Sequence, residues 1–270
     1  MPARCTIGVD IGTSSSKGVL VDAEGAILAS ATVAHDVQRP RTGWVEMDGR
    51  IWWDEFVQIT RELLAEASTR ELDVEIAAVG VSGMGPCVLL ADDADEPVRP
   101  AILYGVDTRA TAQIDRMTAE LGVDDITRVG GSTLTTQAGG PKIVWIADEE
   151  PAAYAAARRL FMPASWLARH LTGAYVLDHQ SASQVSPLYD VEGEQWHTAN
   201  WDRYAPGIEA PRLLWAGDIA GTVTDAAAAA TGLPAGIPVI AGTIDAWSEA
   251  VSVGAHELGD LMLMYGTTMF

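Results

Sequence analysis

The sequence predicts an α/β fold in which a mixed sheet is flanked by helices. Three apolar runs between residues 5 and 34, separated by turn signals, predict three antiparallel strands. Residues 49–68 carry apolar side chains at three- and four-residue steps, which predicts an amphipathic helix with Asp48 as its N-cap. The continuous apolar run at 76–82 predicts a buried parallel strand, so the helix is a crossover connection within one sheet.

Length and composition limit the classes of function. The chain has 270 residues, enough for one large domain or two small ones. Its 17 basic and 37 acidic residues give a net charge of −20, which disfavours nucleic acid and anionic lipid as partners. No apolar run reaches about 18 residues, so we expect no membrane span. The N-terminus runs directly into a predicted strand, and the two cysteines lie in separate apolar runs. We therefore expect a cytoplasmic protein without a signal peptide and with buried free thiols.

The turn between the first two predicted strands carries the first candidate functional residues. Asp10 ends the first strand, and the turn that follows is made of small and hydroxyl residues with a cation behind them: Gly12, Thr13, Ser14, Ser15 and Lys17. Main-chain N–H groups and hydroxyls bind phosphate oxygens, and a carboxylate at a strand end can hold Mg²⁺ through water. This stretch alone predicts a phosphate-binding hairpin, and an ordinary surface hairpin is the alternative.

The rest of the chain alternates predicted strands and helices. Further strands are predicted at 87–91, 101–104, 237–241 and 260–265. Further helices are predicted at 108–121, 142–148 and 225–231, with two helical segments between 151 and 171 that are divided at Pro163. Ligands bind at the carboxyl ends of parallel strands. The turns after 76–82, 101–104 and 237–241 are therefore candidate site segments.

The turn after residues 237–241 contributes a second carboxylate. Asp245 stands in this turn, where an aspartate is also a favoured cap for the helix that begins near Ala246. After the last predicted strand, Gly266 and Thr267 repeat the pattern of the first turn. Two such turns predict a duplicated architecture that binds phosphates from both sides.

The ordered motifs resemble those of the FGGY carbohydrate kinases, the group that includes xylulokinase, gluconate kinase and glycerol kinase. The matching segments are 10–17, 43–48, 79–85, 99–110, Lys142 with Trp145, 171–178, 242–246 and 266–267. The resemblance implies a ribonuclease H-like fold of the actin-like ATPase type, with two related domains around a cleft. It implies that residues 1–242 form the amino-terminal, sugar-binding domain. Residues 243–270 would then begin a second, nucleotide-binding domain that is truncated here.

The resemblance also implies the reaction and its residues. It implies ATP- and Mg²⁺-dependent phosphorylation of a sugar or polyol hydroxyl, with Asp245 as the general base and Asp10 as a water-mediated ligand of Mg²⁺. The residues implied to bind the phosphates of ATP are Asp10, Gly12, Thr13, Ser14, Ser15, Lys17, Gly266 and Thr267. Those implied to contact the sugar are Trp44, Met84, Gly85 and Asp107, and packing or capping is an equal alternative for each of them.

The sugar-contacting segments depart from the pattern of xylulokinase-like members. Met84, Gly85 and Pro86 stand where those members have Gln-Met-His. Ala246 follows the proposed base where an amide is common, and Tyr104 replaces a tryptophan. Because a polar site discriminates strongly through paired hydrogen bonds, the sequence assigns no particular sugar.

Two other functions remain open from the sequence. One is a catalytically inactive sugar-binding sensor on the same fold, and the presence of both Asp10 and Asp245 favours the enzyme over it. The other is an actin- or chaperone-type ATPase, against which the sugar-edge segments 43–53 and 99–110 argue. The expected partner is a small-molecule sugar or polyol, with no nucleic acid and no membrane, and a homodimer is an assembly that the sequence leaves open.

Overall fold

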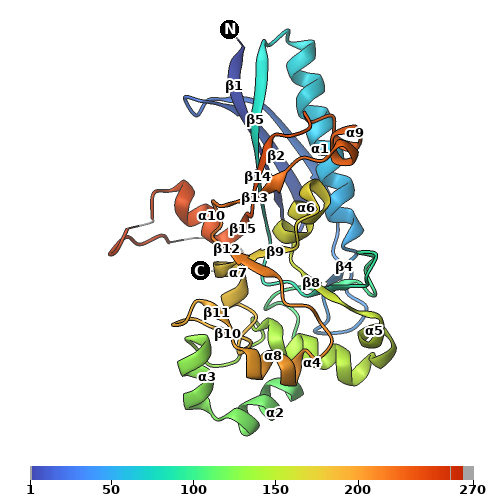
Figure 1. Ribbon diagram of the computed structural model, residues 1–270, viewed down its shortest axis with the longest axis vertical. Helices are drawn as coiled ribbons and strands as arrows, with labels where there is room; N and C mark the ends of the chain where they lie inside the picture. The colour runs from blue at the N-terminus through green and yellow to red at the C-terminus, as the bar shows by residue number, and fades with distance from the viewer. Residues whose placement is uncertain (1, 256, 264–270) are drawn as a thin grey trace.

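The computed structural model describes residues 2–255 and 257–263 and has a mixed sheet as its centre (Figure 1). Within the described chain this sheet has seven strands in the order β13-β14-β5-β1-β2-β3, with β15 also paired to β5. The strands are β1 (Ala3–Ile11), β2 (Ser15–Asp22), β3 (Ile27–Ala34), β5 (Val74–Gly83), β13 (Ile219–Thr222), β14 (Pro238–Ile240) and β15 (Thr243–Ile244). The first three are antiparallel, whereas β1, β14 and β15 run parallel to β5. The predicted mixed sheet is confirmed.

Helix α1 (Arg50–Thr69) connects β3 to β5 and covers one face of the sheet. It buries Trp52, Phe56, Ile59 and Leu63 completely, as the periodicity predicts. The helix lies so close to β2 that a Cβ atom on Gly18 would be 2.2 Å from Ile59. The prediction of Asp48 as the N-cap is wrong by one position, because the helix begins at Arg50 and Gly49 is its N-cap residue. Asp48 precedes the N-cap, and its Oδ1 accepts the Arg50 N–H at 3.0 Å. This packing assigns one sheet face to the hydrophobic core.

Small two-stranded sheets and short helices make up the rest of the described chain (Figure 1). The two-stranded sheets pair β4 (Glu46–Met47) with β7 (Ala101–Ile102), β6 (Leu89–Ala91) with β8 (Arg159–Phe161), β9 (Val176–Asp178) with β12 (Arg212–Leu214), and β10 (Tyr189–Asp190) with β11 (Gln195–Trp196). The helices are α2 (Thr111–Leu121), α3 (Val123–Gly130), α4 (Gly139–Glu149), α5 (Pro151–Ala156), α6 (Pro163–Thr172), α7 (His179–Ser183), α8 (Thr198–Tyr204), α9 (Asp225–Thr231) and α10 (Asp245–Ser252). Helices α6 and α9 pack against α1, whereas α4 and α8 contribute to a second hydrophobic cluster.

Three predictions about elements were wrong. A strand, β8, separates the two helical segments of 151–171, because Leu160 pairs with Leu90 of β6. The strand predicted at 101–104 is only β7, which pairs with β4 outside the main sheet, so Asp107 does not follow a strand of that sheet. Residues 260–263 form no strand, and Leu261 is 78% exposed. Gly266 and Thr267 lie outside the described residues.

Two expectations from composition can be compared with the structure. Cys5 and Cys87 are free and buried, as predicted. Among the helices in the described part of the chain, none combines the length and the apolar character that crossing a bilayer requires.

Candidate functional site

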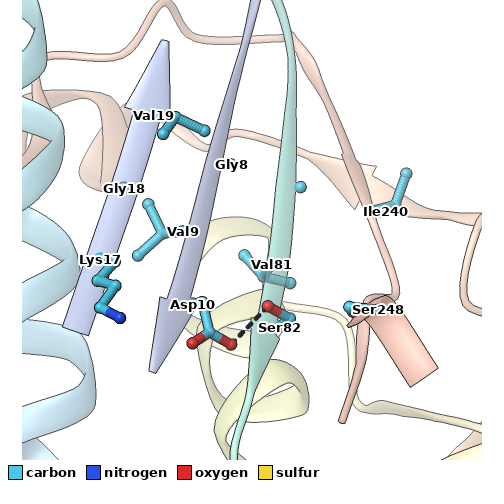
Figure 2. Close-up of a pocket in the computed structure, with 11 residues that line it drawn as sticks. Gly8, Val9, Asp10, Lys17, Gly18, Val19, Val81, Ser82, Ile240 and Ser248 are labelled. Atoms are coloured by element: carbon cyan, nitrogen blue, oxygen red, sulfur yellow. Dashed lines mark hydrogen bonds between the residues drawn. The ribbon is translucent and has the colours of Figure 1, made fainter. Parts of the chain in front are cut away.

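The candidate site lies where β1 and β5 end, on the sheet face opposite α1. Asp10 of β1 pairs in register with Lys17 of β2 and with Ser82 of β5. Residues paired in register point to the same face, and neighbours along a strand alternate. Because Gly18 faces α1, the side chains of Lys17, Asp10 and Ser82 form a row on the other face (Figure 2).

Asp10 is held by Ser82, whose Oγ donates a hydrogen bond to Asp10 Oδ1 at 2.8 Å. Burial raises the pKa of Asp10 above its ordinary value, while the bond from Ser82 and the positive charge of Lys17 act in the opposite direction. The structure therefore confines a carboxylate in a position where its negative charge is only partly compensated.

Asp245 is the first residue of α10, directly after β15 pairs with the end of β5. Burial and then the negative charge of Asp10 raise its pKa to about 6, while a hydrogen bond from the Ala246 N–H opposes that rise. That N–H lies 2.8 Å from Asp245 Oδ1. Ile244 is the N-cap residue of α10 and no side chain caps this helix, so the capping alternative is wrong. With a pKa near 6, the Asp245 carboxylate is suited to accept a proton.

A cavity of about 390 Å³ opens in front of this row of side chains. Its walls come from four strands and α10: Gly8, Val9, Asp10, Lys17, Gly18, Val19, Gly80, Val81, Ser82, Ile240 and Ser248 (Figure 2). Sequence reasoning missed Ser248, Gly8 and Gly80. Gly8 and Gly80 stand two residues before Asp10 and Ser82, so the two-residue period of a strand could have placed them on the same face.

The predicted phosphate hairpin is a tight turn between β1 and β2. The Gly12 N–H donates to the Ser15 carbonyl at 3.1 Å, and a Cβ on Gly12 would lie 2.8 Å from that oxygen. Thr13 Oγ1 and the Tyr104 hydroxyl are hydrogen-bonded at 3.0 Å, while Ser14 and Lys17 are exposed. The turn closure requires glycine at position 12 and leaves hydroxyl and ammonium groups accessible.

The structure places Met84 and Gly85, two of the predicted sugar contacts, beside the core rather than in an open pocket. Met84 is fully buried, and its N–H donates to the Ile11 carbonyl at 2.7 Å. Gly85 packs against Ile244, which would be 2.2 Å from an added Cβ atom. Gly85 therefore sets the position of the residue before Asp245, and Met84 offers no exposed side chain.

Asp107 and Trp44 belong to a buried ionic cluster. Asp107 is 1% exposed, and its Oδ2 accepts from Arg109 at 2.7 Å and from the Val45 N–H at 2.6 Å. Trp44 lies with its ring 4.2 Å from the Arg109 guanidinium. Arg109 also pairs with Glu46, a residue that sequence reasoning missed. These contacts give Asp107 a packing role in the described structure.

The donor set at the site fits a hydrated Mg²⁺ ion. In the part of the chain that the structure describes, no group of three or more His, Cys, Asp or Glu side chains could hold a metal directly. Mg²⁺ takes few protein carboxylates and keeps most of its waters. The raised pKa values of Asp10 and Asp245 show negative charge that a nearby cation would stabilise. Asp10 is thus suited to orient the waters of such an ion.

Comparison with known proteins decides the family. The family model described as the N-terminal domain of the FGGY family of carbohydrate kinases matches residues 5–252. The chain belongs to the FGGY family of carbohydrate kinases. The resemblance of its ordered motifs is thereby confirmed.

Individual relatives cover nearly all of this FGGY chain. It is 33% identical over 277 residues to a xylulose kinase from Streptomyces coelicolor, which covers 97% of the chain and 52% of that protein. It is 28% identical over 278 residues to a glycerol kinase from Janthinobacterium, covering 98% of the chain and 52% of that protein. A crystal structure of xylulose kinase from Rhodospirillum rubrum superposes with a TM-score of 0.91 at 30% identity, covering 97% of the chain and 53% of that structure. The predicted actin-like ATPase fold is confirmed, and the chain spans about half the length of the curated relatives it matches.

Proposed function

We propose that the full-length protein transfers the γ-phosphoryl group of ATP to a hydroxyl group of a sugar or polyol. The pair of carboxylates at the sheet edge carries this proposal. The pKa of Asp245 is raised to about 6, partly by the charge of Asp10. A carboxylate that accepts a proton, beside a second one suited to a hydrated cation, meets two of the requirements of phosphoryl transfer.

In this proposal each group has a distinct task. Asp245 accepts the proton of the attacking hydroxyl, and a pKa near 6 leaves this carboxyl ionised at neutral pH. The main-chain N–H groups of the hairpin and the Lys17 ammonium bind phosphate oxygens and offset their charge. Bound near Asp10 through water, Mg²⁺ supplies further charge neutralisation. Gly266 and Thr267 are proposed to bind the same phosphates from the opposite side.

The proposed domain boundary rests on the family match. We propose residues 1–242 as the sugar-binding domain and residues 243–270 as the beginning of the nucleotide-binding domain. The family match ends at residue 252, close to this boundary, and relatives are about twice as long as the chain. A net charge of −20 and two buried free thiols support a cytoplasmic location.

The test is a coupled assay of ADP release by the full-length protein with Mg²⁺ and panels of pentuloses, hexuloses, aldonates and polyols. Release that depends on one of these classes supports the proposed kinase and names its substrate class. ATP hydrolysis that no sugar stimulates favours the actin- or chaperone-type ATPase. Binding of a sugar without any ADP release favours the inactive sensor.

A further inference from the structure

A chain of buried polar side chains lies behind the phosphate hairpin, on the α1 side of the sheet. Its members are Ser16 of β2, His35 just after β3, and Glu55 of α1. Ser16 is 0% exposed and Glu55 is 8% exposed, and the His35 side chain is 6% exposed. Because burying polar groups is costly unless they are paired, such a cluster needs a structural reason.

The cluster is a continuous series of hydrogen bonds that ends on the hairpin. Ser16 Oγ donates to Glu55 Oε2, and the same carboxyl is 2.9 Å from His35 Nδ1. His35 Nε2 is 3.0 Å from the Gly12 carbonyl oxygen. The His35 main-chain N–H also donates to the Ser14 carbonyl at 3.1 Å. Residue 35 therefore binds two carbonyls of the same turn.

The partners determine where the protons of His35 lie. The Gly12 carbonyl can only accept, so His35 Nε2 carries a proton. His35 Nδ1 faces the Glu55 carboxyl, and the pair holds one proton between them, either as imidazolium with carboxylate or as imidazole with carboxylic acid. Both forms are neutral overall and leave no buried charge without a partner.

These bonds change which groups of the turn remain free. In a common β-turn the first carbonyl accepts the N–H of the fourth residue, which here would be Ser15. His35 occupies the Gly12 carbonyl instead. Among the described residues the Ser15 N–H makes no hydrogen bond to that carbonyl, and the Thr13 N–H, which lies in the turn, has no acceptor. Because a trans peptide is planar, the Thr13 N–H points away from the Gly12 carbonyl and hence away from His35. Main-chain N–H groups that a turn directs to one side form an anion-binding concavity.

We propose that His35, held by Glu55, is a positioning residue that fixes the Gly12–Thr13 peptide so that the Thr13 and Ser15 N–H groups bind a phosphate. This role deepens the proposed kinase function and rests on it. Glu55 connects His35 to α1, and the packing of α1 against the sheet restricts the movement of both side chains. Without this pair, the Gly12 carbonyl is free to rotate towards the Ser15 N–H and remove it from the phosphate site.

The test uses a triple variant of the full-length protein, Ser16→Ala/His35→Phe/Glu55→Leu. Removing all partners together leaves no unpaired buried charge, whereas a single replacement would leave one, so we expect the triple variant to fold. Glu55→Gln is the conservative partner, because its amide can donate to His35 Nδ1 and its oxygen can accept from Ser16. Thermal melting establishes that each variant is folded, and calorimetry measures its affinity for ADP with Mg²⁺.

We expect the folded triple variant to bind ADP about tenfold more weakly, the equivalent of one lost hydrogen bond to a charged group, and Glu55→Gln to stay within about twofold of the parent. Amide hydrogen exchange across residues 11–17 should accelerate in the triple variant. In steady-state assays KM for ATP should rise while KM for the sugar does not, a split that a general structural defect does not produce. A folded triple variant with parental ADP affinity overturns the inference. A parent protein that does not bind ADP at all overturns the proposed function as well.

Discussion

The negative charge of Asp10 helps to raise the pKa of Asp245 to about 6, although one residue lies near the end of β1 and the other begins α10. The parallel pairing of β1 and β15 with β5 brings them together, because each strand ends at the same edge of the sheet. The two carboxylates therefore act on one another before any ligand binds.

Replacing the proposed base should abolish turnover and leave the sugar site intact. We expect Asp245→Asn in the full-length protein to reduce kcat by about 10²- to 10⁴-fold, because an amide cannot accept the hydroxyl proton. Asp225→Asn is the matched control, since Asp225 is the exposed first residue of α9 and occupies the same position in its helix. Steady-state kinetics and sugar binding by calorimetry measure both variants. Equal turnover in the two variants would exclude Asp245 as the general base.

The raised pKa of Asp245 predicts two opposite pH dependences. Turnover should rise with pH through about 6 and then level off, as the base becomes ionised. Stability should change in the other direction. Between pH 3.8, the ordinary value, and about 6, the folded chain holds a proton on Asp245 that the unfolded chain has released. The contribution of this group to the free energy of unfolding therefore falls as pH rises through that window.

Urea denaturation of the parent and of Asp245→Asn at pH 4.5 and pH 7 isolates that contribution. The stability difference between the two proteins should shift in favour of the variant as pH increases, because asparagine has no charge to bury. A difference that is independent of pH contradicts the raised pKa.

The sequence predicted those parts of the site that depend on local pattern. Asp10 ends an apolar run, the hairpin follows it, and Asp245 lies in the turn after another run. Strand ends and turn chemistry therefore marked these positions as candidates, and the family resemblance supplied their expected roles. The edge that gathers them follows from the general rule for parallel strands. Gly8 and Ser248 were missed because a glycine or serine within an element carries no functional signal until its face is known.

Other features depend on which distant segments the fold brings together. Glu55 lies on α1 among core residues, and only its distance from His35 shows that it supports the hairpin. Met84 has the same motif position as a ligand contact, yet packing places it in the core. Strand β8 was hidden because Arg159, Leu160 and Phe161 are too few to show a period, and pairing with β6 stabilises them. Tertiary contacts determine the environment of Glu55 and Met84 and the formation of β8. A local sequence pattern therefore could not predict them.

The two lysines of the chain should respond in opposite ways to replacement by methionine. Lys142 is 1% exposed, and its Nζ donates to the Leu103 and Tyr104 carbonyls at 2.6 and 2.8 Å. Lys142→Met leaves both oxygens unsatisfied, and we expect a loss of about 1–3 kcal/mol in the free energy of unfolding. Lys17 is exposed beside the cavity, so Lys17→Met should keep parental stability and raise KM for ATP. Denaturation curves and kinetics of both variants separate the roles.

Burial gives Lys142 a distinct pH signature. Desolvation lowers its pKa from 10.5 to about 8, so the folded chain releases this proton while the unfolded chain still holds it. The free energy of unfolding should therefore rise between about pH 8 and pH 10.5 through this group. Lys142→Met should lack that rise when both proteins are denatured across the same pH range. An identical alkaline slope in the two proteins contradicts the assignment.

Gly85 controls the position of the base through Ile244. A Cβ atom at residue 85 would lie 2.2 Å from Ile244 Cγ2, so Gly85→Ala must displace the residue that precedes Asp245. Because a displacement of about 1 Å can cost about 10²-fold in rate, we expect a large fall in kcat. Gly217→Ala is the control, since no atom lies within 4 Å of its added Cβ. Ile244→Ala in the Gly85→Ala background removes the clash and should restore part of kcat. If the double variant is no faster than Gly85→Ala, the defect does not pass through Ile244.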